Sequence, residues 1–230
     1  MKEFVRKIPI LGSLAQRIFR SFTKRAVSFP GSKNYWESRY KTGGNSGAGS
    51  YQKLAAFKAE ILNEFVVKNH IETVIEYGCG DGNQLTLSEY PSYVGFDVSE
   101  KAIAICSTLF ETDTSKRFSV LGERKGEAAQ LTISLDVIYH LIEDSVFSDY
   151  MSVLFDSATK FVIIYSSNSN GEEYGRAPHV KHREFVPWIE SNRPKWRLIQ
   201  HLENRYPYVS GDNVNGSFSD FYIFSLSDNN

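Results

Sequence analysis

The sequence predicts an α/β domain with a mainly parallel sheet and helices on both faces. Three observations support this prediction. Short apolar runs alternate with longer helical stretches, a glycine-dense turn follows the first apolar run, and the last two runs have no helix between them. Alternation of this kind is typical of parallel strands joined by crossover helices, whereas strands joined by a loop alone usually pair antiparallel.

The predicted elements follow one another as short strands and longer helices. Strands are expected over residues 73–76, 93–97, 118–121, 131–135, 160–165, 196–202 and 218–226. Helices are expected over residues 50–69, 99–109, 146–158 and 184–191. Ser99 is a suitable N-cap for the second of these helices, because Glu100 places an acid in its first turn. The final two strands are expected to form an antiparallel pair.

Length and composition are those of an ordinary globular protein, with 230 residues of which 41% are hydrophobic and 23% charged. The net charge of -1 argues against a general nucleic-acid binder, because such proteins need a basic face, and it favours small-molecule partners. Cys79 and Cys106 each lie in a predicted βα unit, which disfavours a disulfide framework and makes a reducing cytoplasm the simplest setting. No apolar run approaches the roughly 18–20 residues that span a bilayer.

Residues 1–31 form a basic amphipathic segment, which we treat as separate from a domain over residues 32–230. Its basic residues, opposed by Glu3 alone, are Lys2, Arg6, Lys7, Arg17, Arg20, Lys24 and Arg25. One interpretation is a peripheral anchor at the anionic inner face of a membrane. The alternative is a helix packed on the domain or a loosely ordered leader.

The segment 42–50 is too rich in glycine for a helix or a strand. It offers many backbone N–H groups and hydroxyls, and Tyr35, Trp36, Tyr40 and Tyr51 flank it. We interpret it as a lid that covers a ligand, with a flexible linker as the alternative.

The strongest local pattern is the apolar strand that runs into the glycine turn at 78–82. Gly78, Cys79, Gly80 and Gly82 have the spacing Gly-x-Gly-x-Gly, which lets a ligand approach the main chain. The spacing of a dinucleotide-binding turn fails, because its third glycine would fall at Asn83. Glu76 precedes the turn, and its carboxylate suits a cationic amino acid group, such as that of S-adenosylmethionine, better than a pyrophosphate.

The second strand ends in Asp97, followed by Val98. A carboxylate at this position can accept hydrogen bonds from both ribose hydroxyls. Asp97 and Val98 are therefore expected at a nucleoside site, although capping the next helix is the alternative role for Asp97.

With these residues the sequence resembles the class I S-adenosylmethionine-dependent methyltransferases over residues 51–226. Glu76, Gly78, Gly80 and Gly82 stand in the family's first motif and Asp97 in its second. The resemblance implies a Rossmann-like seven-stranded sheet with helices on both faces and an antiparallel last strand, and S-adenosylmethionine as cofactor. Segments 35–40 and 134–141 are similar to bacterial methyltransferases associated with polysaccharide biosynthesis, which implies O-methylation of a sugar hydroxyl.

The resemblance places the methyl group and the acceptor after the fourth strand, where Asp136, Tyr139 and His140 stand. Asp136 is a candidate for both cofactor binding and catalysis, Tyr139 for acceptor binding, and His140 for the general base. If the chain is helical there, the spacing of Asp136 and His140 puts them on one face. A hydrogen-bonded structural histidine is the alternative for His140.

A second polar cluster lies at 179–183. His182 is another candidate base, and Arg183 is a candidate to hold a carboxylate or phosphate of the acceptor. No metal is predicted, because His179 and His182 lack a convincing third ligand nearby.

Three other functions stay open at this point: methylation of another small metabolite at nitrogen or oxygen, a nicotinamide-dependent oxidoreductase, and a non-catalytic binding module on the same fold. Asn83 disfavours the oxidoreductase.

Overall fold

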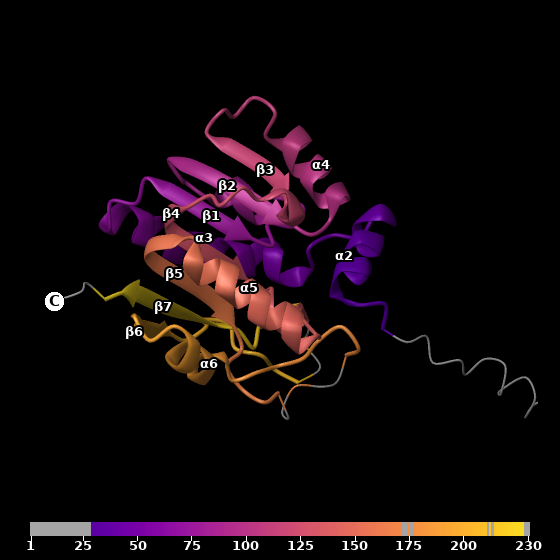
Figure 1. The fold of residues 1–230 in the computed structure, drawn as a ribbon. Coiled ribbons are helices and arrows are strands. Elements are labelled where there is room, and N and C mark those ends of the chain that lie inside the picture. Colours follow the sequence, from indigo (N-terminus) through magenta and orange to yellow (C-terminus); the bar gives the residue numbers. More distant parts are fainter. Residues whose placement is uncertain (1–28, 172–173, 175–176, 211, 213, 228–230) are drawn as a thin grey trace, which may run out of the picture. The chain divides into compact units, whose positions relative to one another are not determined.

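The computed structural model contains a seven-stranded sheet in the order β3-β2-β1-β4-β5-β7-β6 (Figure 1). The strands are β1 (Thr73–Tyr77), β2 (Ser92–Asp97), β3 (Lys116–Val120), β4 (Ala129–Leu135), β5 (Ala158–Ser166), β6 (Trp196–Leu202) and β7 (Asp220–Leu226). β7 pairs antiparallel with both β5 and β6, and the other pairs are parallel. The predicted α/β class with an antiparallel last strand is confirmed.

The structure describes residues 29–171, 174, 177–210, 212 and 214–227. Residues 31–230 form one compact unit, and the description below concerns this unit. The predicted basic segment 1–31 lies almost entirely outside the described residues. In the described part of the chain, no helix is long and apolar enough to cross a membrane.

Helices cover both faces of the sheet. They are α3 (Gln52–Lys68), α4 (Glu100–Leu109), α5 (Asp144–Asp156) and α6 (Phe185–Asn192), whereas α2 (Ser32–Lys41) packs beside α4. Neighbouring residues of a strand point to opposite faces, so Ile75 of β1 packs in the core with α5 and α6, while Val74 packs in the core with α3 and α4. Central strands with two buried faces explain the continuous apolar runs in the sequence.

Most predicted elements are found within two residues of their expected bounds. Ser99 caps α4 as predicted, and its Oγ accepts a hydrogen bond of 3.1 Å from the Ala102 N–H. The expectation of no helical structure in 42–50 was wrong, because a 3₁₀ turn spans Ala48–Ser50. Helix α2 was not predicted, because only Ser32 and Tyr40 of this helix are buried and its apolar pattern is weak.

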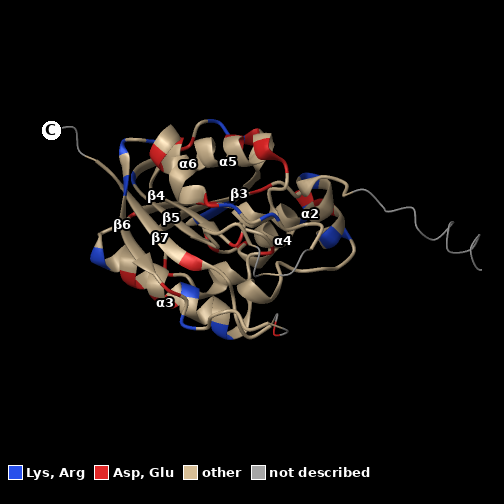
Figure 2. Ribbon diagram, turned by 90° about the horizontal axis from the view of Figure 1, so that it is seen from below, with Lys and Arg blue, Asp and Glu red and all other residues tan. Residues whose placement is uncertain are grey.

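Charged residues of both signs are dispersed over the helices and loops of this unit (Figure 2). Cys79 and Cys106 are buried free thiols.

Candidate active site

The glycine turn after β1 needs glycine for two separate reasons. Gly78, Gly80 and Gly82 have φ angles of 83°, 59° and 78°, a region that side chains with a Cβ rarely adopt. The turn is also tightly packed, since a Cβ on Gly78 would lie 2.5 Å from Cγ2 of Val137. The turn and the segment that follows β4 are therefore held against each other.

Gly82 and Cys79 of the turn are packed against neighbouring elements of the domain. A Cβ on Gly82 would lie 3.0 Å from the Cys106 sulfur, so Gly82 permits close approach to α4. Cys79 is also buried, and its sulfur lies where a Cβ on Gly95 of β2 would meet it. In this structure both positions serve packing, and their predicted contact with a cofactor stays a prediction.

Asp97 ties the end of β2 to the glycine turn. Its Oδ2 accepts a hydrogen bond of 3.0 Å from the Gly80 N–H, and its Oδ1 accepts one of 2.9 Å from the Ser99 N–H. Burial raises the pKa of Asp97 to about 6, and the backbone hydrogen bonds oppose that rise. Val98, half-buried, follows it directly. Asp97 thus has a structural role, and its contact with ribose hydroxyls stays a prediction.

Glu76 of β1 is a buried carboxyl without a direct cationic partner in the described chain. The Tyr93 hydroxyl donates a hydrogen bond of 2.7 Å to it. Burial raises its pKa to about 7, and this rise is opposed by the Tyr93 hydrogen bond and by the charge of Lys58. A bound cation would favour the ionised form of this carboxyl, which fits the predicted contact with a cationic group.

The segment 42–50 lies on the glycine turn and is held there by Asp81. The Asp81 carboxylate accepts hydrogen bonds from the Ser46 N–H (2.9 Å) and the Tyr51 hydroxyl (2.8 Å). The Asp81 N–H in turn donates to Ser46 Oγ, which also lies 3.0 Å from the Tyr40 hydroxyl. That this loop covers a ligand stays a prediction. Asp81 was not singled out from the sequence, although an acid within a glycine turn is a recognisable signal.

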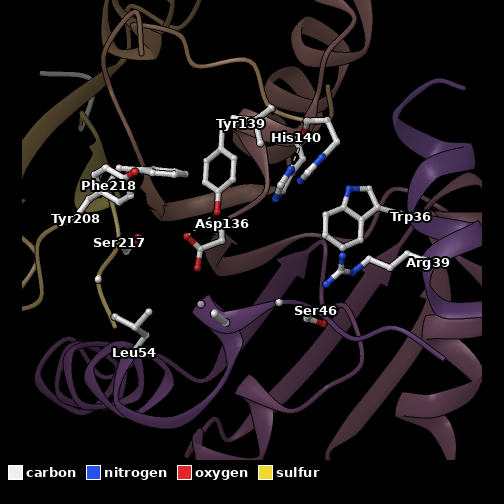
Figure 3. A pocket seen from close by; sticks show the side chains of 16 residues that line it. Trp36, Arg39, Ser46, Leu54, Asp136, Tyr139, His140, Tyr208, Ser217 and Phe218 are labelled. Atoms are coloured by element: carbon white, nitrogen blue, oxygen red, sulfur yellow. Dashed lines mark hydrogen bonds between the residues drawn. The ribbon is translucent and has the colours of Figure 1, made fainter. Parts of the chain in front are cut away.

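A cavity of about 260 Å³ lies on the other side of this loop (Figure 3). Its wall is rich in aromatic and imidazole rings and combines α2, the loop, the start of α3, the segment after β4, the segment between β5 and α6 and the segment between β6 and β7. The lining residues are Trp36, Arg39, Ser46, Gly47, Ala48, Gly49, Leu54, Asp136, Tyr139, His140, His179, Val180, Tyr208, Gly216, Ser217 and Phe218. No residue of the glycine turn belongs to this lining, so the loop stands between the turn and the cavity.

Asp136 is the central polar group of the cavity. Its Oδ2 lies 2.7 Å from the Lys58 Nζ, and its Oδ1 accepts hydrogen bonds from Tyr139 (3.1 Å) and Ser219 (3.0 Å). It adopts a positive φ of 59°, which is strained for a residue with a Cβ. Sequence reasoning missed Lys58, because a lysine within an amphipathic helix is usually solvated.

Replacement of Lys58 by methionine is expected to lower the free energy of unfolding by about 2–4 kcal/mol, because it leaves the Asp136 carboxylate without its cation. Lys58 is fully buried, whereas Asp136 keeps two other donors and is 12% exposed, so the loss should stay below that of a fully enclosed pair. Urea unfolding measures it. Lys68→Met, an exposed change on the same helix, is the control and should have little effect. Equal stability of both variants would contradict this role of Lys58.

Asp136 and His140 both line the cavity, but through a 3₁₀ turn (Ile138–His140) rather than the α-helix that their spacing suggested. His140 Nδ1 lies 2.9 Å from the carbonyl oxygen of His179, which can only accept. Nδ1 therefore carries the proton and Nε2 is left with a free lone pair. Burial lowers the pKa of His140 to about 4, so the ring is neutral at neutral pH.

His182 and Arg183 do not belong to the cavity lining. The His182 ring packs on Phe218 with centroids 4.6 Å apart, and its Nδ1 lies 2.6 Å from Ser167 Oγ. Arg183 donates to the Leu141 carbonyl at 2.6 Å and also to the Ile142 carbonyl and the Asp144 carboxylate. These contacts hold the segment after β4 in place, and acceptor binding by Arg183 remains a prediction.

Among described residues, no group of three or more potential ligands is arranged to hold a metal.

Comparisons with known proteins identify the fold. No family model and no curated protein matches the sequence. The N-methyltransferase NodS from Bradyrhizobium japonicum WM9, in complex with S-adenosyl-l-homocysteine, superposes with a TM-score of 0.62 at 12% identity, covering 86% of this chain and 99% of that one.

Two other solved structures are similar. Magnesium protoporphyrin IX methyltransferase from Synechocystis PCC 6803, with bound SAM, has a TM-score of 0.56 at 15% identity, covering 92% of this chain and 97% of that one. The methyltransferase domain of bacterial CtHen1-C has a TM-score of 0.56 at 18% identity, covering 75% and 98%. Together with the strand order, these similarities show that the chain has the seven-stranded α/β methyltransferase fold.

Proposed function

We propose that this chain is an S-adenosylmethionine-dependent methyltransferase that acts on a hydroxyl of a sugar-like acceptor. The observation that carries the proposal is an arrangement at the carboxyl ends of the central strands. The glycine turn follows β1, the buried carboxyls of Glu76 and Asp97 lie near the ends of β1 and β2, and an aromatic cavity lies at the end of β4. The strand order reverses between β1 and β4, and ligands of open α/β sheets bind at such a point.

The chemistry of the donor set fits this cofactor. Asp97 supplies carboxylate oxygens suited to ribose hydroxyls, and Glu76 supplies a carboxyl whose ionisation a cationic amino group would favour. The cofactor, when bound, supplies an electrophilic methyl group on a sulfonium centre.

The protein's own part in the reaction is to orient the acceptor and to take its proton. A hydroxyl is a weak nucleophile until its proton is withdrawn, and His140 has an unprotonated Nε2 in the wall of the cavity. Asp136 is a weaker candidate because its carboxylate already accepts from Lys58, Tyr139 and Ser219. His182 is weaker because it does not line the cavity.

The choice of a sugar rests on the similarity of segments 35–40 and 134–141 to bacterial methyltransferases of polysaccharide biosynthesis. These two segments supply Trp36, Arg39, Asp136, Tyr139 and His140 to the cavity wall. Aromatic walls with a few polar groups are typical of small-ligand sites. Transfer of labelled methyl groups to extracted surface glycans tests this choice, and transfer to amines alone would overturn it.

Binding of the cofactor is tested by calorimetry with S-adenosylmethionine, S-adenosylhomocysteine and NAD. Asp97→Ala is expected to weaken S-adenosylhomocysteine binding by about 1–3 kcal/mol, because ribose hydroxyls would be left unpaired. It should also lower stability, because the N–H groups of Gly80 and Ser99 lose their acceptor. Asp97→Asn keeps an acceptor oxygen, so its affinity and its stability should lie between those of the wild type and of Asp97→Ala. Preferential binding of NAD would favour an oxidoreductase, and unchanged affinity in both variants would refute the role of Asp97.

The basic segment 1–31 carries a separate proposal of peripheral membrane contact, supported by its composition alone. The full chain is expected to co-sediment with anionic vesicles and to be released by salt, because salt screens exposed charges. A chain that begins at Ser32 should stay in the supernatant. Equal sedimentation of both proteins would place any membrane affinity elsewhere.

A further inference from the structure

Among the described residues that line the cavity, one cation has no ionic partner. Arg39 and Asp136 are the charged residues of its lining, and Asp136 is paired with Lys58. Arg39 forms no ion pair with the residues that the structure describes, and its Nε donates a hydrogen bond of 2.6 Å to the carbonyl oxygen of Asn45. This bond and the Trp36 ring, 5.6 Å from the guanidinium carbon, hold the side chain in place. Figure 3 shows the guanidinium below Trp36, directed into the cavity.

The other titratable lining groups do not supply positive charge. Burial lowers the pKa of both His140 and His179, so these rings are neutral at neutral pH. The Lys58 charge is balanced by Asp136. The two terminal nitrogens of Arg39 make no hydrogen bond within the described part of the chain, so a planar fork of donors faces the cavity, and the acid among the described lining residues, Asp136, is already paired with Lys58.

We infer that the acceptor carries an anionic oxygen group, a carboxylate or a phosphate, which the terminal nitrogens of Arg39 bind as a fork. Guanidinium matches both groups in a two-point contact, and such a contact is stronger at a partly enclosed site than in water. The remainder of the acceptor then lies among the rings of Trp36, Tyr208 and Phe218. That the bound molecule is the methyl acceptor rests on the proposed function, whereas anion binding rests on the cavity alone.

Arg39 lies apart from the residues that are predicted to bind the cofactor. Residues 46–49 of the loop 42–50 stand between the cavity and the glycine turn, and Arg39 lines the cavity while Gly78, Gly80 and Asp97 do not. Asn45, whose carbonyl oxygen holds the guanidinium, belongs to the same loop. An anion bound at Arg39 is therefore expected to leave the affinity for S-adenosylhomocysteine unchanged.

The test uses the full-length protein and matched sugar probes. Glucose, galactose and mannose are compared with their 1-phosphates and with the corresponding uronic acids, by saturation-transfer NMR titration with and without saturating S-adenosylhomocysteine. At least one acidic probe should bind roughly tenfold more tightly than its neutral counterpart. Arg39→Gln should abolish this preference. Arg39→Lys should retain part of it, since the charge stays but the fork is lost. Lys33→Gln removes an exposed charge from the same helix and should change nothing.

Different results would overturn the anion-binding inference and the proposed function. The inference is overturned if no acidic probe binds more tightly than its neutral counterpart, if Arg39→Gln keeps the preference, or if that variant instead weakens S-adenosylhomocysteine binding. Thermal unfolding of Arg39→Gln and Arg39→Lys checks that both are folded. Failure of wild-type protein to bind S-adenosylhomocysteine would instead refute the proposed function, while a preference for acidic probes that depends on Arg39 would still stand.

Discussion

Replacement of His140 by glutamine is expected to lower turnover by roughly a hundredfold or more, the usual scale of general-base assistance. Glutamine can donate to the His179 carbonyl as the histidine does, but it offers no basic nitrogen to the acceptor hydroxyl. Affinity for S-adenosylhomocysteine should stay nearly unchanged, because His140 lies beyond the loop that covers the glycine turn. Single-turnover methyl transfer at saturating cofactor measures the change.

The pH profile gives a second readout for His140. Burial holds its pKa near 4, so the neutral base is present at higher pH and is lost as pH falls through about 4. With cofactor saturating, the acid limb of turnover should therefore lie well below the value of about 6.5 for an unperturbed histidine. The same shift predicts that stability is full above about pH 6.5 and declines as pH falls toward 4, because the unfolded state binds the proton first.

His182→Gln is the matched control for this prediction. His182 packs against Phe218 outside the cavity lining, so its replacement should leave turnover close to that of the wild type. Full turnover in His140→Gln would rule His140 out. Asp136 would then be tested, or an amine acceptor that arrives already deprotonated.

Replacement of Gly78 by valine is expected to abolish measurable binding of S-adenosylhomocysteine. Gly78 has a φ of 83°, and its added Cβ would lie 2.5 Å from Cγ2 of Val137, so the turn and the segment after β4 must separate. The strain and overpacking should also lower the free energy of unfolding by a few kcal/mol. Calorimetry measures the loss of binding, and circular dichroism at low temperature checks that the domain is folded.

Gly126→Val is the control for backbone strain. Gly126 has a similar φ of 88°, but a Cβ there meets no atom within 4 Å. This variant should lose some stability and bind S-adenosylhomocysteine normally. A folded Gly78→Val protein with normal affinity would refute the assignment of the glycine turn to the cofactor.

Local patterns in the sequence were sufficient for the fold and for the outline of the site. Apolar periodicity predicted the seven strands, because each central strand must bury both faces. The glycines at 78, 80 and 82 predicted a tight turn, because few other residues tolerate its positive φ. Asp97 could also be identified from the sequence, since an acid at the end of an apolar strand differs in polarity from the residues before it.

The tertiary structure alone decided which of the candidate residues share a cavity. His140 and His182 are both candidate bases in the sequence, but of the two only His140 lines the cavity, because the 3₁₀ turn after β4 places it in the wall, while His182 packs on Phe218 outside the lining. Lys58 meets Asp136 through packing of α3 on the sheet, a contact between residues 78 positions apart. Arg39 reaches the cavity only because α2 packs against α4 and the loop that holds its guanidinium is bonded to the glycine turn. Such contacts depend on the packing of distant segments, and no local spacing in the chain encodes them.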